Sequence, residues 1–222
     1  MYEFYVSFWN VNNLFDTLPT SIGSTVEFTP DRGWNNVIKN KKIENLAHVI
    51  NSLHDNQGPD IIGLCDFESA QLAPHSIDKL RSEKEYSIAQ YLNSPDIRGI
   101  DTCLLYSKKL FRLNAVKGYS TNLRYPTRDI LVVNLTVLSN NADFNIIVNH
   151  WPSRAGGRFE TEPLRIAVAE NCARAVEDIL KISQSELQNL PRELRHDEKS
   201  LSLLNERWNK NILLMGDFND NP

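Results

Sequence analysis

Four groups of polar residues, each placed after an apolar, strand-like run, have the types and positions needed for phosphate chemistry. They are Asn10, the pair Asp66 and Glu68, His150, and the pair Asp217 and Asn219. The end of a strand holds a side chain rigidly, while the loop beyond it leaves room for a ligand. Carboxylates, amides and imidazoles can bind a divalent cation, activate water and transfer protons. This distribution predicts a site for phosphate-ester hydrolysis.

The segment from Gly216 to Asn219 follows the last apolar run of the sequence. Because side chains alternate along a strand, Asp217 and Asn219 are expected on one face, with Phe218 pointing into packing on the other. A carboxylate there can orient or deprotonate a water, and an amide can donate to a phosphoryl oxygen. The alternative is an ordinary turn after a strand, since glycine, aspartate and asparagine all favour turns.

Asp66 and Glu68 share a face by the same alternation, and hard oxygen ligands of this kind suit Mg²⁺ or Mn²⁺. Asn10 can contact either the metal or the phosphate through its amide. Taken singly, the acidic pair also fits a solvated loop, and Asn10 also fits a turn. Together they predict a metal site at Asn10, Asp66 and Glu68.

His150 ends an apolar run and precedes a glycine-rich loop. A histidine there could protonate a leaving oxygen. The loop supplies the hydroxyl of Ser153 and the guanidinium groups of Arg154 and Arg158, which suit phosphate oxygens. The alternative is a structural histidine above a glycine-rich turn.

The elements that must position these residues can be predicted from hydrophobic periodicity. Apolar residues at helical spacing predict helices over residues 39–54 and 161–179, with a weaker signal over 73–81. In the second helix the apolar side is Leu164, Val168, Cys172, Ala175 and Ile179. Strands are expected over residues 2–11, 60–65, 86–92, 102–107, 130–138, 144–148 and 211–215, and residues 184–210 read as a polar surface excursion. Two packed sheets covered by helices, an α+β fold, follow from this order.

Composition limits the classes of function. The chain has 222 residues, 41% hydrophobic and 23% charged, which predicts a single globular domain over residues 1–222. Its three cysteines are odd in number and far apart, which favours buried free thiols over disulfides or zinc. A net charge of −4 slightly disfavours a nuclease that binds long duplexes. With neither a membrane span nor a signal peptide visible, we expect a cytoplasmic chain, and the oligomeric state stays open.

Six segments in order resemble motifs of the endonuclease/exonuclease/phosphatase family, whose fold is that of DNase I. They read FWNVNNLFD, DIIGLCDFES, RGIDTCLLY, TRDI, NHWPSR and LLMGDFND, and they span nearly the whole chain. The resemblance implies a four-layer α/β/β/α sandwich with the site at one edge of its two sheets. It also implies roles for the residues, with metal-binding at Asn10 and Asp66, catalysis at His150, Asp217 and Asn219, and phosphate contacts at Arg128, Ser153 and Arg154.

Three departures from the family pattern are visible. Asp66 stands where the family most often has Glu, so either the metal lies closer to that strand or Glu68 shares the role. Asn12 replaces an acid found in many close relatives. The family ends with an Asp-His pair on a later strand, whereas this sequence stops at Asn221-Pro222. We therefore expect a domain lacking its C-terminal strands, with little or no turnover by itself.

Two classes of function remain at this point. The first is a hydrolase of nuclease, phosphodiesterase or phosphatase type, in which water attacks the phosphorus in line with help from Mg²⁺ or Mn²⁺. Its substrate would be a nucleic acid or a small phosphorylated molecule. The second is a non-catalytic fragment or module that keeps a phosphate-binding cleft without turnover.

Overall fold

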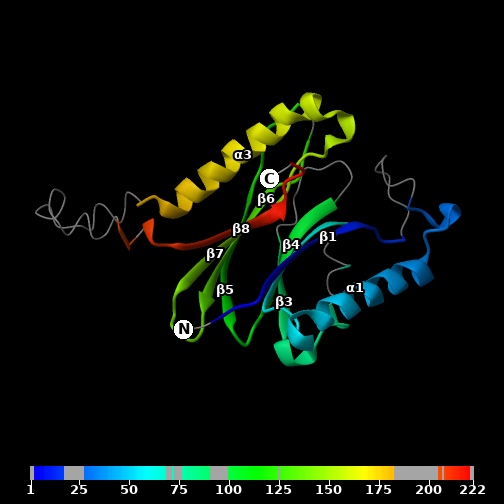
Figure 1. Ribbon diagram of the computed structural model, residues 1–222, viewed down its shortest axis with the longest axis horizontal. Coiled ribbons are helices and arrows are strands. Elements are labelled where there is room, and N and C mark those ends of the chain that lie inside the picture. The colour runs from blue at the N-terminus through cyan, green and yellow to red at the C-terminus, as the bar shows by residue number, and fades with distance from the viewer. Residues whose placement is uncertain are drawn as a thin grey trace, which may run out of the picture.

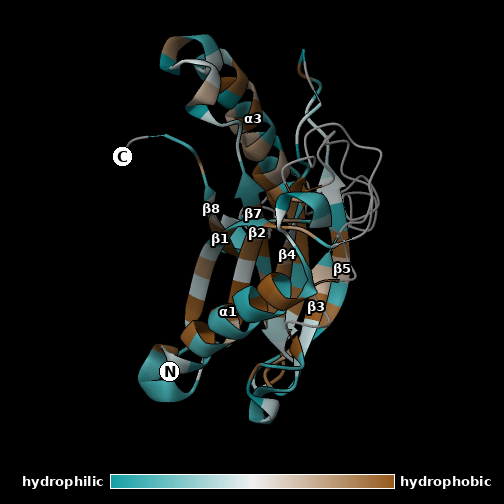
Figure 2. Cartoon of the chain, turned by 90° about the vertical axis from the view of Figure 1, so that its right-hand side faces the viewer, coloured by the Kyte–Doolittle hydropathy of each residue, from teal (hydrophilic) through white to brown (hydrophobic). Residues whose placement is uncertain are grey.

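The computed structural model describes residues 3–17, 28–68, 72, 77–90, 100–124, 126–182, 205–206 and 208–220. In this part of the chain two four-stranded sheets pack face to face, with α1 and α3 on the outer faces (Figures 1 and 2). The first sheet has the order β1-β2-β4-β3 and the second β5-β6-β7-β8. The expected α/β/β/α sandwich is confirmed.

The bounds of the elements are as follows. The first sheet contains β1 (Val6–Leu14), β2 (Ile61–Glu68), β3 (Tyr86–Gln90) and β4 (Ile100–Ser107), and the second contains β5 (Phe111–Tyr119), β6 (Ile130–Val137), β7 (Asp143–His150) and β8 (Asn211–Asp217). The long helices are α1 (Asn36–Asn56) and α3 (Arg158–Leu180), and short 3-10 turns are η2 (Pro30–Arg32), η3 (Ser82–Lys84) and η4 (Arg154–Gly156).

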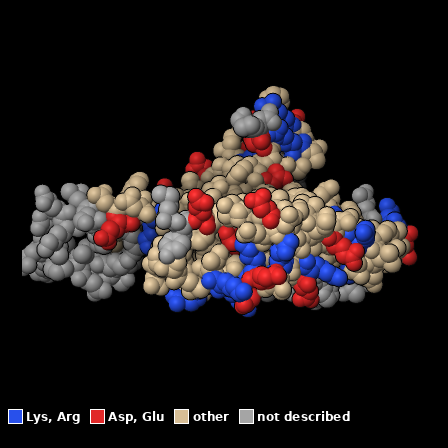
Figure 3. Space-filling model, turned by 60° about the horizontal axis from the view of Figure 1, so that its bottom comes forward, with Lys and Arg blue, Asp and Glu red and all other residues tan. Residues whose placement is uncertain are grey.

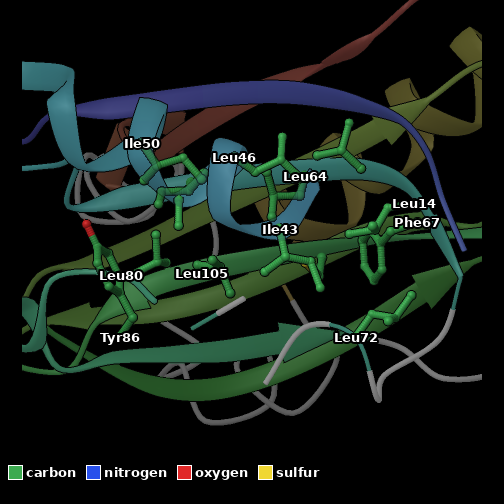
Figure 4. Packing of buried hydrophobic residues seen from close by; sticks show 14 residues of the cluster. Leu14, Ile43, Leu46, Ile50, Leu64, Phe67, Leu72, Leu80, Tyr86 and Leu105 are labelled. Atoms are coloured by element: carbon green, nitrogen blue, oxygen red, sulfur yellow. The ribbon is translucent and has the colours of Figure 1, made fainter. Parts of the chain in front are cut away.

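Three apolar cores separate the four layers. The first lies between α1 and the first sheet, where Ile43, Leu46 and Ile50 pack on Leu64 and Leu105 (Figure 4). A second core fills the space between the sheets, and a third lies between the second sheet and α3. Since β2 has a helix on one face and a sheet on the other, all eight of its residues are buried. That explains why its sequence reads as a continuous apolar run.

Two β-α-β units determine where the functional residues lie. β1 and β2 are parallel and are connected through α1, and β7 and β8 are parallel and are connected through α3. Parallel neighbours place their C-terminal ends at the same end of a sheet, where ligands of such sheets usually bind. The C-terminal halves of these strands, which carry Asn10, Asp66, His150 and Asp217, are therefore brought together in pairs.

Most expected elements are present, with shifted bounds. The strand expected at residues 2–11 is Val6–Leu14, and β5 was not predicted, because it is a half-exposed strand at a sheet edge interrupted by polar residues. The strands expected at residues 130–138 and 144–148 are β6 and β7, which pair as an antiparallel hairpin. Residues 73–76 of the weak helix and most of the excursion at 184–210 fall outside the described residues.

Helix α3 differs from its prediction at its start and on its buried face. It begins at Arg158, after Gly157 with φ 104°, rather than at Thr161. Its buried residues are Arg165, Val168, Cys172 and Ala175, so a charged residue replaces the predicted Leu164 on the innermost face. All three cysteines are buried and free. No helix in the described ranges is long and apolar enough to cross a membrane.

Candidate active site

Asn10 and Asp217 come together where the two sheets adjoin, and Asp66 lies on β2, the strand next to β1. The amide Nδ2 of Asn10 donates to Oδ2 of Asp217 at 2.8 Å, which links the edge strands β1 and β8 across the sheets. Cys65 is the register partner of Asn10 and immediately precedes Asp66. Burial is the main cause that raises the pKa of the Cys65 thiol, and the charges of Asp217 and Asp66 raise it further.

Asp217 and Asn219 are adjacent, but not through strand alternation. The strand ends at Asp217, and Asn219 has a left-handed φ of 49°. Its backbone N–H donates to Oδ1 of Asp217 at 3.0 Å, and its Nδ2 donates to the carbonyl oxygen of Trp151 at 2.9 Å. The segment is therefore a turn in which Asp217 contacts Asn10 and Asn219 contacts the backbone after β7. Phe218 is half-buried against the Trp151 ring, with 4.9 Å between ring centroids, rather than in one of the cores.

Gly216 is required by the close approach of β7. A Cβ atom at this position would lie 2.5 Å from the carbonyl oxygen and 2.6 Å from the Cβ of Asn149. Asn149 is fully buried and cannot easily move, because its side chain contacts Met215, Trp151 and Cys172. Glycine thus lets β8 pack tightly enough to deliver Asp217.

We expect Gly216→Ala to destabilise the protein by about 1 to 3 kcal/mol, as overpacking of a tight interior does. Urea denaturation would measure the change. Gly156→Ala is the matched control, since its Cβ would meet only a side-chain methyl of Thr161, at 3.3 Å. Equal stability of the two variants would show that β7 and β8 are not held at this distance.

Asp66 contacts the end of β1 and Glu68 contacts the chain just after it, but strand alternation is not what places them there. The pairing of β2 with β4 shifts between Cys65 and Phe67, and Asp66 has φ 68°. Asp66 accepts the Asn13 N–H at 2.9 Å, and Glu68 accepts the Asp16 N–H at 2.8 Å. Burial raises the pKa of Glu68, while the Asp16 N–H opposes that shift. Glu68 thus contacts a later residue of the chain, Asp16, whereas Asp66 contacts Asn13.

Lys42 on α1 is a component that the sequence analysis missed. Its ammonium donates to the carbonyl oxygens of Asn12 and Asn13, two residues with left-handed φ values of 54° and 62°. Burial lowers the pKa of Lys42, and the charge of Asp66 raises it. Lys42 therefore holds the irregular part of β1 at Asn12 and Asn13. The backbone N–H of Asn13 is the one that donates to Asp66. The sequence feature that could have identified Lys42 is its position next to Ile43, a buried residue of α1.

His150 and Arg128 flank the same corner. His150 is the last residue of β7, is 8% exposed and is the register partner of Asp217. Arg128 is buried, and its Nη2 donates at 2.8 Å to the Trp151 carbonyl that also accepts from Asn219. Arg128 is therefore part of the hydrogen-bond network around Asp217, and His150 lies on the strand beside Asp217.

Ser153 and Arg154 line an open pocket together with residues 216–220. Arg154 donates from Nε to the carbonyl of Asn219 at 2.6 Å and from Nη2 to Asp220 at 2.8 Å. Ser153 accepts the Ala155 N–H at 3.1 Å. Both residues are thus next to Asp217 and Asn219, as a role in phosphate contact requires.

The oxygen ligands at this corner fit magnesium or manganese better than zinc. In the part of the chain that the structure describes, no three His, Cys, Asp or Glu residues lie close enough to hold a metal by themselves. Mg²⁺ needs no such group, because it keeps several waters and binds through one or two carboxylates. The predicted metal residues Asn10, Asp66 and Glu68 offer an amide and two carboxylates, which matches that preference.

A mixed two-sheet sandwich with polar strand ends at one corner is the architecture of a known class of phosphoesterases. The sequence profile of the Endonuclease/Exonuclease/phosphatase family matches residues 5–190, and the chain belongs to this family. A search of curated protein sequences gives no match.

Solved structures agree on the fold. TDP2 from C. elegans superposes with a TM-score of 0.59 at 18% identity, covering 98% of this chain and 48% of that one. A mannosyl-6-phosphatase from Bacteroides thetaiotaomicron gives 0.58 at 13% identity, over 99% and 67%. The human Nocturnin catalytic domain gives 0.54 at 15% identity, over 96% and 63%. The chain thus spans about half the length of the TDP2 structure.

Proposed function

We propose that the protein hydrolyses phosphate esters with the help of Mg²⁺ or Mn²⁺, by in-line attack of water. The observation that carries this proposal is the Asn10–Asp217 hydrogen bond between the sheets, with Asp66 next in the chain to Cys65, the register partner of Asn10. Family membership supports phosphoester hydrolysis in general, and the oxygen ligands support the choice of metal.

Asn10 and Asp66 would hold the metal ion, and the carboxylate of Glu68 would contribute to the same metal site. When bound, such an ion neutralises charge on the phosphoryl group and lowers the pKa of a coordinated water. These three residues form the metal-binding part of the proposal.

The remaining residues would act on water and substrate. The carboxylate of Asp217 orients the attacking water and accepts its proton, and the Asn219 amide donates to a phosphoryl oxygen. His150 protonates the leaving oxygen. Further phosphate oxygens are contacted by Arg128, Ser153 and Arg154, whose positions around residues 216–220 favour this role.

A small phosphorylated molecule is the substrate class that the charges favour over a long duplex. The net charge is −4, and acidic and basic side chains are interspersed on the face shown in Figure 3. Proteins that hold long nucleic acids usually present a continuous basic surface.

The second candidate is a phosphate-binding module without turnover. One observation favours it, because both carboxylate oxygens of Asp217 accept hydrogen bonds within the protein, from Asn10 and from Asn219. An activity assay separates the two candidates.

The assay compares p-nitrophenyl phosphate with bis(p-nitrophenyl) phosphate, using the protein at its natural length. We expect hydrolysis with Mg²⁺ or Mn²⁺ and loss of it in EDTA. Full activity in EDTA after removal of bound metal would contradict the metal-dependent proposal. Phosphate binding without hydrolysis of either ester would favour the module.

The raised pKa of Glu68 predicts a pH dependence of metal binding. Its carboxyl stays protonated to a higher pH than usual, and a metal ligand must lose its proton. As the pH falls, Mn²⁺ affinity should therefore begin to decrease at a higher pH than with an ordinary glutamate ligand, and Glu68→Gln should remove much of this dependence. In the absence of metal, the pH dependence of folding stability has the opposite sign. A raised carboxyl pKa stabilises the folded protein in acid, and this stabilisation is lost as the pH rises.

Isothermal titration of Mn²⁺ at several pH values would measure this effect. The exposed Glu83, in η3, provides the control substitution Glu83→Gln. An unchanged pH profile in Glu68→Gln would exclude Glu68 from the metal site.

A further inference from the structure

A second open pocket lies at the end of the first sheet that is opposite to Asp66. It forms where the end of α1 meets the segment before β3 and the turn between β4 and β5 (Figure 1). Ser107, in its wall, ends β4, and its N–H donates to the carbonyl of Asp60, just before β2. The pocket is therefore separated from Asp66 by about 20 Å, since strand residues rise roughly 3.3 Å each. Its volume of 410 Å³ is typical of small-molecule sites.

Arg81 lines this pocket with a guanidinium group that has no protein partner. Its Nε is buried and has no hydrogen-bond acceptor. Among the described residues, its two terminal nitrogens likewise take part in no hydrogen bond or ion pair. Buried polar groups nearly always have a partner, and a partly buried charge is costly without one. The guanidinium group is therefore suited to an acceptor that a ligand brings.

The backbone that carries Arg81 is fixed against α1. The side chain of Asn51 accepts the Arg81 N–H at 3.0 Å through Oδ1, and donates to the Lys79 carbonyl at 3.0 Å through Nδ2. These two hydrogen bonds hold both ends of a short stretch of chain. Arg81 thus starts from a rigid position at the rim of the pocket, which lowers the entropy cost of binding through its side chain.

The two lysines of the pocket differ in how fully they are paired. Lys84 lies 2.6 Å from Asp60, whose other carboxylate oxygen accepts the Tyr5 N–H at 3.0 Å. Asp60 is therefore fully used and does not serve as a counter-ion for Arg81. Lys109 lies 3.5 Å from Glu85, and both side chains are about half exposed. Because an exposed pair of this kind contributes little, the Lys109 ammonium can also contact a ligand.

Glu83 also lines the pocket, and its negative charge opposes the binding of an anion. Glu83 is exposed, so water and salt screen its charge. The charge of Arg81 acts from a partly buried position, where electrostatic interactions are stronger. The balance in the pocket therefore favours an anion. The planar guanidinium group matches a carboxylate or a phosphate, which it can contact with two parallel N–H groups.

We propose that this pocket binds a small molecule through a carboxylate or phosphate group, with Arg81 as the main contact and Lys109 as the second. None of its residues belongs to the candidate active site, so the proposal is independent of the proposed function.

Site-resolved NMR of the full chain tests the proposal. Sodium phosphate and sodium acetate are titrated in parallel at constant ionic strength, with sodium chloride as the reference salt. We expect saturable shifts in the amide signals of Gln57, Arg81 and Lys109 with at least one of the two anions. The anion that binds more tightly identifies the acidic group of the ligand. Lack of saturable shifts at these residues with both anions would overturn the proposal.

Substitutions assign the binding to Arg81. Arg81→Gln should weaken binding at the pocket by about tenfold or more, since charged hydrogen bonds are lost. Arg81→Lys keeps the charge without the planar group and should have intermediate affinity. Glu83→Gln should tighten binding a fewfold, because the opposing charge is removed. The exposed Arg174 provides the control Arg174→Gln, which should leave the affinity unchanged.

The signal of Asn219 separates this pocket from the candidate active site. Phosphate that also binds near Asn219 should shift its signal equally in wild type and Arg81→Gln. A folded Arg81→Gln with wild-type affinity at the pocket and a lower melting temperature would give Arg81 a structural role only, and would overturn the proposal. If Arg81→Gln does not fold, unchanged affinity in both Arg81→Lys and Glu83→Gln would overturn it.

Discussion

Asp217→Asn is expected to lower the rate of phosphoester hydrolysis by roughly a hundredfold to ten-thousandfold, the usual effect of losing a positioned base. The substitution keeps the shape of the side chain and one acceptor oxygen, but removes the charge that holds and deprotonates water. It also removes one of the two hydrogen bonds from Asn10 and Asn219, at a stability cost of about 1 to 2 kcal/mol. Initial rates and thermal melts on the same preparation separate the two effects.

Two further variants make this test specific. Asp143→Asn introduces the same change at the opposite end of β7, where Asp143 is exposed, and should leave the rate unchanged. Phe218→Ala should cost about 1 to 2 kcal/mol of stability, because the ring is only half-buried on Trp151. If Asp217→Asn is destabilised while its folded fraction keeps the wild-type rate, Asp217 serves only as a turn residue.

His150→Gln is expected to produce a similarly large loss of rate, about a hundredfold or more, and the loss should depend on the leaving group. A general acid matters most when the departing oxygen is strongly basic. The loss should therefore be large for alkyl phosphate esters and small for p-nitrophenyl esters, whose leaving group needs little protonation. Rates for a series of esters would measure this dependence.

Metal binding provides the control for His150. Since the imidazole is not assigned as a ligand, Mn²⁺ affinity should be the same in wild type and His150→Gln. An equal loss of rate for every leaving group would assign His150 to substrate positioning rather than to proton transfer.

The local sequence predicts those parts of the fold that depend on periodicity. The buried positions of α1 and the continuous apolar run of β2 follow directly from residue spacing. The strand ends at His150 and Asp217 could be identified for the same reason. The order of the elements along the chain also predicts the two sheets. Strands joined through helices pair in parallel and strands joined by short turns pair as hairpins, which leaves few alternative topologies.

The details that long-range contacts decide could not be predicted. The bulge at Asp66 depends on the pairing of β2 with β4, and it replaces the simple alternation expected there. Arg165 is buried because Asp220, 55 positions away, supplies its counter-ion. Its spacing of three and seven residues from Val168 and Cys172 did place it on the buried face of α3, which was the available signal.

Binding of Mn²⁺ to wild type and to Asp66→Asn, measured by isothermal titration with Asp143→Asn as control, tests the metal-dependent site most directly. We predict that the wild-type protein and Asp143→Asn bind Mn²⁺ equally well, and that Asp66→Asn binds it at least about tenfold more weakly, because a carboxylate ligand is lost. Equal affinity in all three proteins, or no binding by the wild type, would contradict a metal site at the ends of β1 and β2.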